Sequence, residues 1–240
     1  MRRAVLGLLV LAALGAPIRF AAAYEGQGTP TELNAAKQLF RAGRYSLAEA
    51  KLKEITGRAP GDGQIEPNNL LAFTYYKQDK LEAASAQFGY TLELIETEAR
   101  KNQPDPTEEA PVDARFETTY YAAVEVLVRS ERYIEAIRIF DRVQQRPSFG
   151  KNPALQQLLG LTLLATGQYD RAVAAFQRQE RLEANPETDY HIACARARQG
   201  RLKDARRALA KAIQRRSELR AQAEADPACF AAIDLNTLGS

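Results

Sequence analysis

The stretch PALQQLLGLTLLATGQYDRAVAAFQRQERLEANP, residues 153–186, decides the fold of this chain. Its apolar residues recur at helical spacing on both sides of Gly167, which predicts two short helices joined by a tight turn. Ala172 and Phe176 share one face of the second helix, because residues four apart are neighbours on a helix surface. Pro186 ends the hairpin, since proline cannot continue a helix.

Gly160 lies in the middle of the first predicted helix, between Leu159 and Leu163 on one face. A side chain at this position would hold the two backbones apart, so the glycine predicts a close helix crossing. A single hairpin of this size cannot bury its own apolar face. It needs similar hairpins stacked on either side.

The chain supplies such neighbours, because the same turn occurs five times. In each copy an aromatic residue or Leu is followed three residues later by Ala and four residues after that by a large apolar residue. The small Ala marks a helix crossing, and the large residue fills the space beside it. The copies are Gly43–Tyr45 with Ala48 and Leu52, Asp79–Leu81 with Ala84 and Phe88, Glu131–Tyr133 with Ala136 and Phe140, Gly167–Tyr169 with Ala172 and Phe176, and Gly200–Leu202 with Ala205 and Leu209.

The spacing between turns, measured from Tyr45 through Leu81, Tyr133 and Tyr169 to Leu202, is 36, 52, 36 and 33 residues. The one long interval holds residues 101–111, KNQPDPTEEAP, with three prolines and three acids. We therefore expect a loop or linker there, inserted between the second and third hairpins.

This period of about 34 residues, with its turn, crossing residue and closing proline, resembles the tetratricopeptide repeat. The resemblance covers residues 31–216 and implies an all-α, right-handed solenoid of five helix–turn–helix repeats. The fifth repeat and tail, with residues 192–195, Asp226-Pro227 and Phe230, also resemble the end-of-group form of bacterial repeats. Residues 217–233 are then expected to form a capping helix, broken or kinked at Asp226-Pro227, and residues 217–240 the cap and tail.

The first 23 residues have the pattern of a cleavable signal peptide. Arg2 and Arg3 precede an apolar run of 13 residues, and Ala21–Ala23 offers a small-residue cleavage pattern before Tyr24. The run is shorter than the ~20 residues that a membrane-spanning helix needs, and no other stretch predicts one. We therefore expect a periplasmic or secreted protein with a loose lead-in at 24–30.

Charge is distributed unevenly along the chain. Cleavage would remove three arginines and lower the formal charge from +3 to zero. Residues 196–220 nevertheless carry ten Lys and Arg against Asp204 and Glu218. Such a run is more often a solvated helix face, but it could also dock on an anionic envelope surface. Export argues against nucleic acid as a partner.

Few residues could support catalysis. A Ser-His-Asp or Cys-His arrangement would have to use His191, the only histidine. His191 and Cys194 lie three residues apart on one predicted helix, so a thiol or metal site around His191, Cys194 and Cys229 is the alternative to a binding function. A zinc site would need two further ligands, and no motif provides them. We expect no enzyme and no cofactor.

Cys194 and Cys229 are the only cysteines. An exported protein could join them in a disulfide. Because pairing requires tight geometry, two buried thiols are the favoured expectation and the bridge is the alternative.

The resemblance also indicates where a partner would bind. In tetratricopeptide stacks the first helix of each repeat lines a concave groove, which implies a protein–protein interaction adaptor holding a peptide or a partner's helix. The corresponding groove positions are Lys37, Phe40, Arg41, Phe73, Tyr76, Lys77, Tyr121, Glu125, Arg129, Leu161, Leu164, Tyr190 and Arg198, with Cys194 beside them.

Overall fold

The computed structural model describes residues 31–57, 64–101 and 112–238. The predicted signal peptide, the lead-in at 24–30 and residues 102–111 of the predicted insert lie outside these residues. The described chain divides into two compact units between Ser130 and Glu131. Each unit is described separately below.

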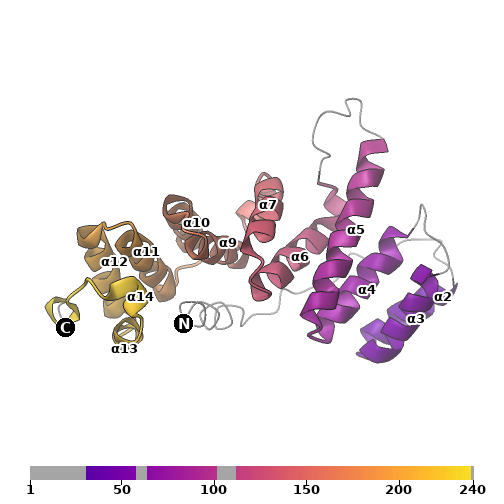
Figure 1. The fold of residues 1–240 in the computed structure, drawn as a ribbon, viewed down its shortest axis with the longest axis horizontal. Coiled ribbons are helices and arrows are strands. Elements are labelled where there is room, and N and C mark those ends of the chain that lie inside the picture. The colour runs from indigo at the N-terminus through magenta and orange to yellow at the C-terminus, as the bar shows by residue number, and fades with distance from the viewer. Residues whose placement is uncertain (1–30, 58–63, 102–111, 239–240) are drawn as a thin grey trace. The chain divides into compact units, whose positions relative to one another are not determined.

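The N-terminal unit is a series of antiparallel helices in which each helix packs on the next (Figure 1). Helices α2, α4 and α6 each correspond to the first helix of a predicted repeat, and we call them first helices. Among them, α2 contacts α4, and α4 contacts α6. The elements are α2 (Thr31–Arg41), α3 (Tyr45–Gly57), α4 (Ile65–Lys77), α5 (Leu81–Lys101), the short 3-10 helix η1 (Ala114–Phe116) and α6 (Glu117–Arg129).

The C-terminal unit continues the same pattern. Helix α7 packs on α9, and α9 through α12 pack in sequence, while α13 packs on α12 and α14 packs on α11. The elements are α7 (Tyr133–Val143), α8 (Pro147–Gly150), α9 (Pro153–Ala165), α10 (Tyr169–Leu182), α11 (Pro186–Arg198), α12 (Leu202–Arg215), α13 (Leu219–Glu224), α14 (Pro227–Phe230) and the 3-10 helix η2 (Leu235–Thr237).

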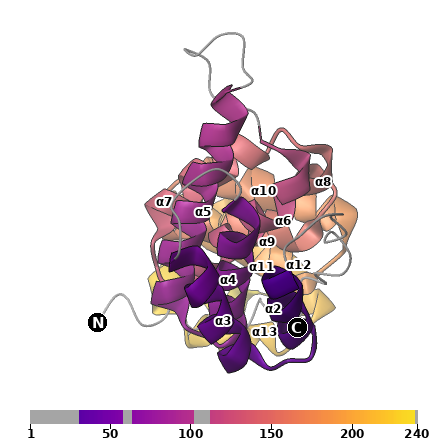
Figure 2. The same ribbon diagram turned by 90° about the vertical axis from the view of Figure 1, so that its right-hand side faces the viewer.

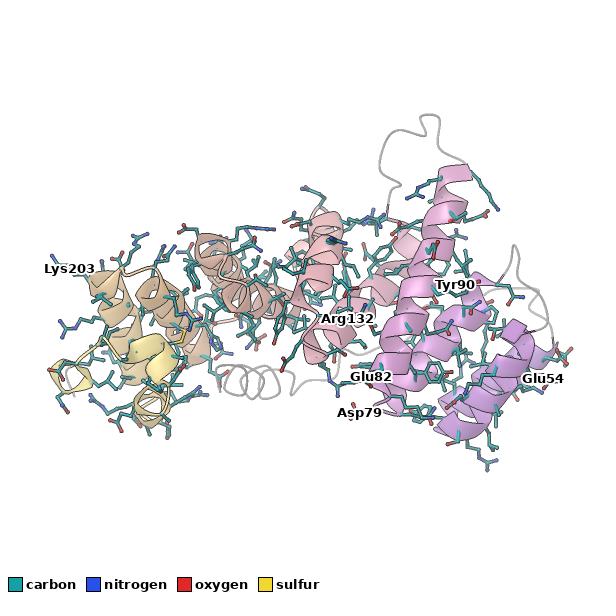
Figure 3. All side chains as sticks on the ribbon, viewed as in Figure 1. Glu54, Asp79, Glu82, Tyr90, Arg132 and Lys203 are labelled. Atoms are coloured by element: carbon teal, nitrogen blue, oxygen red, sulfur yellow. A yellow bond between two sulfur atoms is a disulfide. The ribbon has the colours of Figure 1, made fainter. Side chains whose placement is uncertain are left out.

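The predicted turns have the expected backbone. Gly43, Gly167 and Gly200 have φ of 71°, 79° and 76°, in the left-handed region that glycine adopts without a steric penalty. Asp79 and Glu131 occupy the same turn position with φ of 58° and 57°. Asp79 and Glu82 lie at the turn end of the α4–α5 hairpin (Figure 3). Both non-glycine turns carry backbone strain, because a side chain disfavours this conformation.

The repeated small and large residues form the core, as predicted. All five alanines at the crossing position are fully buried, and the five large residues that follow them are at most 1% exposed. At Gly160, a Cβ atom would lie 2.5 Å from Cε1 of Phe176. The close approach of α9 and α10 therefore requires glycine there.

The sequence did not predict every element. Helix α5 has 21 residues, several more than the other second helices, and it extends past α4 in both ribbon views (Figures 1 and 2). A one-turn helix, α8, precedes α9. The cap, by contrast, breaks where the sequence predicts, at Asp226 and Pro227, and forms two short helices, α13 and α14.

The prediction of an all-α fold of helical hairpins is confirmed. No strand occurs in the three described ranges. Among the same residues, no helix is both long enough and apolar enough to cross a bilayer. The handedness of the whole solenoid stays a prediction.

Candidate functional site

Nine of the predicted groove residues lie on α2, α4 and α6 of the N-terminal unit. We call them the first-helix face: Lys37, Phe40, Arg41, Phe73, Tyr76, Lys77, Tyr121, Glu125 and Arg129. Side-chain pairs connect the three helices within this unit. Lys37 forms an ion pair with Glu66, which joins α2 to α4. The Tyr76 hydroxyl donates a hydrogen bond to Glu125 Oε1 at 2.6 Å, which joins α4 to α6.

Two further pairs connect α6 to α4 and to the turn that follows α4. The Thr119 hydroxyl donates to Asn69 Oδ1 at 3.0 Å, and both side chains are buried. Arg129 forms an ion pair with Asp79, in the turn after α4. Sequence reasoning missed Glu66, Asn69, Asp79 and Thr119. The sequence signal that could have identified them is a polar residue at a position where one helix packs on its neighbour.

The nine residues differ in how much of each side chain solvent can reach. Arg41 and Lys77 are exposed, and Phe40, Tyr76 and Arg129 are half-buried. The other four are buried: Lys37, Phe73, Tyr121 and Glu125. Phe73 packs edge-to-face on Phe88 of the same hairpin, with ring centroids 5.1 Å apart. A partner on this face would therefore contact the five exposed or half-buried residues directly.

The hydroxyl of Tyr76 on this face has a raised pKa. Burial raises the pKa of the Tyr76 hydroxyl well above its ordinary value, and the hydrogen bond to Glu125 raises it further. The phenol therefore keeps its proton and remains the donor to the Glu125 carboxylate. Lys77 Nζ lies 5.6 Å from the centroid of the Tyr76 ring, within the range of a cation–π contact.

The remaining predicted groove residues belong to the C-terminal unit. Leu161, Leu164 and Tyr190 are buried, at 2%, 6% and 1% exposure, while Arg198 is exposed. The Tyr190 ring packs edge-to-face on Phe230, with centroids 5.2 Å apart. Its hydroxyl donates to Asp226 Oδ2 at 3.2 Å. The predicted groove face of α11 is therefore occupied by the chain's own C-terminal segment.

Cys194 and Cys229 form a disulfide, with their Cα atoms 4.9 Å apart. The expectation of two buried thiols was wrong. Asp226 caps α14 by accepting from the Cys229 N–H at 3.3 Å, and Pro227 begins the helix. The break between α13 and α14 lets α14 pack on α11, and this places Cys229 beside Cys194.

The disulfide also removes the alternative of a thiol site, because it leaves no free cysteine in the described part of the chain. The sulfur atoms and a carboxylate oxygen of Asp226 lie within 4.8 Å of one another, but the sulfurs bond each other. His191 is buried and stacks on Phe176, with ring centroids 5.2 Å apart. Burial lowers its pKa to about 4, so the imidazole is neutral at pH 7.

The basic run at 196–220 is extensively paired within the C-terminal unit. Arg215 contacts both Glu180 and Asp189, each at 2.7 Å. Arg220 donates to the carbonyls of Leu235 and Leu238. Similar ion pairs are Arg196–Asp170, Arg201–Asp204, Arg207–Asp204, Lys211–Asp189 and Arg216–Glu187. Six of the ten cations in the run pair with acids of the same unit, and a patch for an anionic surface finds no support.

Comparison with known proteins gives the same fold. A family model described as "Anaphase-promoting complex, cyclosome, subunit 3" matches residues 129–212. No curated protein matches the chain. The solved structure of YrrB, titled "a TPR protein with an unusual peptide-binding site", is 17% identical with a TM-score of 0.60. The match covers 78% of this chain and 85% of YrrB.

MamA structures are similar as well. MamA from Desulfovibrio magneticus RS-1 is 19% identical with a TM-score of 0.55, covering 76% of this chain and 92% of MamA. MamA AMB-1 is 18% identical with a TM-score of 0.58, covering 76% of this chain and 88% of that one. The protein therefore has the fold of a tetratricopeptide repeat protein, as its sequence predicts.

Proposed function

We propose that the protein is a non-catalytic adaptor of the bacterial envelope, which binds a peptide or a partner's helix on the first-helix face. The observation that carries this proposal is the series of side-chain pairs that joins α2 to α4 and α4 to α6. These pairs hold three consecutive first helices in one arrangement before any partner arrives. A preformed surface costs less ordering entropy on binding.

The accessible part of this face has the chemistry of a binding surface. Phe40 and Tyr76 supply apolar area that is half-buried already, and Arg41 and Lys77 supply exposed positive charge. Aromatic residues and arginine are enriched where binding energy concentrates, since they combine contact area with hydrogen bonding. A segment with an apolar side chain and a nearby carboxylate would complement them. YrrB, which is described as having an unusual peptide-binding site, supports a peptide-binding function by analogy of fold alone.

A non-catalytic role is consistent with where the reactive residues lie. The one histidine is buried against Phe176, and both cysteines are joined in the disulfide. Neither is available as a base or nucleophile to a substrate on the first-helix face.

Photo-crosslinking in the native host tests the proposal. The photoreactive residue would replace Lys77, which is exposed on α4; Tyr121, although predicted to line the groove, is too buried to serve. Glu54 is exposed on the second helix α3 of the same unit and is the matched control (Figure 3). We expect a discrete adduct from position 77 alone. Adducts from position 54 alone, or from neither position, would contradict binding on this face.

The envelope location rests on the signal pattern of residues 1–23 and needs its own test. We expect the protein in the periplasmic or extracellular fraction, with a mature N-terminus at Tyr24. Full-length protein in the cytoplasmic fraction, starting at Met1, would contradict export while leaving the binding proposal intact.

A further inference from the structure

The C-terminal segment 226–230 occupies one face of α11 through contacts of three kinds. Tyr190, Cys194 and Arg198 lie at four-residue intervals along α11, so they share one face of that helix. The Tyr190 hydroxyl bonds the Asp226 carboxylate at 3.2 Å, and its ring packs on Phe230. Arg198 Nη1 donates to the Ala228 carbonyl at 3.1 Å.

These contacts define what the α11 face recognises. It accepts a single helical turn that begins with a carboxylate, carries a free carbonyl in its middle, and presents an aromatic ring four residues after the carboxylate. Asp226 and Phe230 are both buried, at 5% and 2% exposure, so both side chains of the segment pack into the fold. The α11 face therefore has the properties of a peptide-binding site that is occupied by residues 226–230 of the same chain.

The disulfide is the only covalent bond between this occupant and α11. Helix α14 has four residues, which is far too short for a helix to persist without tertiary support. Cys194 is buried at 4% exposure, whereas Cys229 is half-buried, so a reductant reaches the Cys229 sulfur more readily. The bond that retains the segment is thus also the one that thiol chemistry can break.

We propose that the α11 face is a second, latent peptide-binding site, closed by residues 226–230 and opened when a dithiol reduces the Cys194–Cys229 disulfide. One thiolate of the dithiol attacks the Cys229 sulfur, and the electron pair of the broken sulfur–sulfur bond passes to Cys194, which takes up a proton. The second thiol then displaces the Cys229 thiolate, which is protonated in turn. The dithiol leaves as its disulfide, and the chain gains two thiols.

Hydrogen exchange of the full chain, with and without dithiothreitol, tests whether the disulfide holds residues 226–230 on α11. We expect exchange of amides at 228–238 to accelerate by about tenfold or more on reduction, because a typical disulfide contributes more than that factor to local stability. Amides of α9 should not change. The double variant Cys194→Ser/Cys229→Ser should behave as the reduced protein does. Unchanged exchange at 228–238, or equal acceleration in α9, would overturn the proposal.

Peptide binding tests the site itself. The probe is a fluorescent peptide of residues 225–235 in which serine replaces the cysteine, and the host is the full chain with Cys229→Ser and Phe230→Ala, which weakens the resident segment. We expect this host to bind the probe and the oxidised parent chain not to bind it. Adding Tyr190→Phe to the host should weaken binding by about tenfold, since it removes a hydrogen bond to a carboxylate.

Failure of the opened host to bind the probe, or equal binding by the oxidised chain, would overturn the latent site. The inference goes beyond the adaptor proposed above, because it concerns α11 and not the first-helix face. Its failure would leave the crosslink expected from position 77 unaffected, so the two proposals fail separately.

Discussion

Replacement of Gly160 by alanine tests the close helix crossing that the repeat pattern predicts. The new Cβ would lie 2.5, 2.7 and 2.8 Å from three ring carbons of Phe176, where carbon atoms normally approach to ~3.5–4 Å. Phe176 is fully buried, so its ring has little room to move. Overpacking of this kind costs about 1–3 kcal/mol, whereas alanine gains ~1 kcal/mol over glycine in a helix.

The two effects together predict that Gly160→Ala destabilises the C-terminal unit by up to about 2 kcal/mol. Native-state hydrogen exchange of amides in α9 and α10 measures this locally, without assuming that both units unfold together. The double variant Gly160→Ala/Phe176→Leu should lose less than the sum of the single variants, since the smaller side chain relieves the clash.

Gly89 in α5 provides the matched control. It also lies inside a helix, but nothing lies within 4 Å of the position its Cβ would take. Gly89→Ala should therefore stabilise the N-terminal unit by about 1 kcal/mol through helix propensity alone. If Gly160→Ala were also stabilising, the close crossing of α9 and α10 would be refuted.

Three further predictions follow from single residues. Glu131→Gly should raise stability by about 1 kcal/mol in a denaturant titration, because Glu131 has a φ of 57°; a loss of stability would refute the strain. The imidazole of His191 should titrate near pH 4 in an NMR titration, and stability should fall as pH drops from ~6.5 towards 4, because only the unfolded chain then binds the proton; a pKa near 6.5 would refute its burial. Glu49, whose pKa is lowered to about 2 by hydrogen bonds from Lys53 and Lys80, contributes stability that is present above pH ~4.5 and lost as pH falls towards 2. Glu49→Gln should cost about 1–3 kcal/mol in urea unfolding at pH 7 and remove that acid dependence.

The elements that sequence predicted correctly are those fixed by local pattern. The turn, the alanine at each crossing and the large residue four positions after it occur together in every repeat. Gly160 could be assigned to a close crossing because glycine is unfavourable in a helix interior, and a close approach of two helices accounts for its presence there. These features depend on residues within about ten positions of one another, so a single sequence contains them.

What the sequence could not predict depends on contacts between distant positions. The disulfide requires α14 to pack on α11, which follows from the break at Pro227 and the burial of Phe230. The ion pairs of the basic end depend largely on acids more than twenty residues away, such as Asp189 beside Arg215. Which groove positions remain accessible depends on side-chain direction. Tyr76 on α4 is half-buried, whereas Tyr121 on α6 is buried.

The central claim is that the first-helix face of the N-terminal unit binds a partner. The most direct measurement is the affinity of the crosslinked partner, once captured, for two charge-reversal variants of the full chain. Arg41→Glu changes the exposed end of α2 on this face, and Lys51→Glu makes the same charge change on the second helix α3. We predict that Arg41→Glu weakens binding by about tenfold or more while Lys51→Glu leaves it within about twofold. Equal affinities for the two variants would contradict the claim.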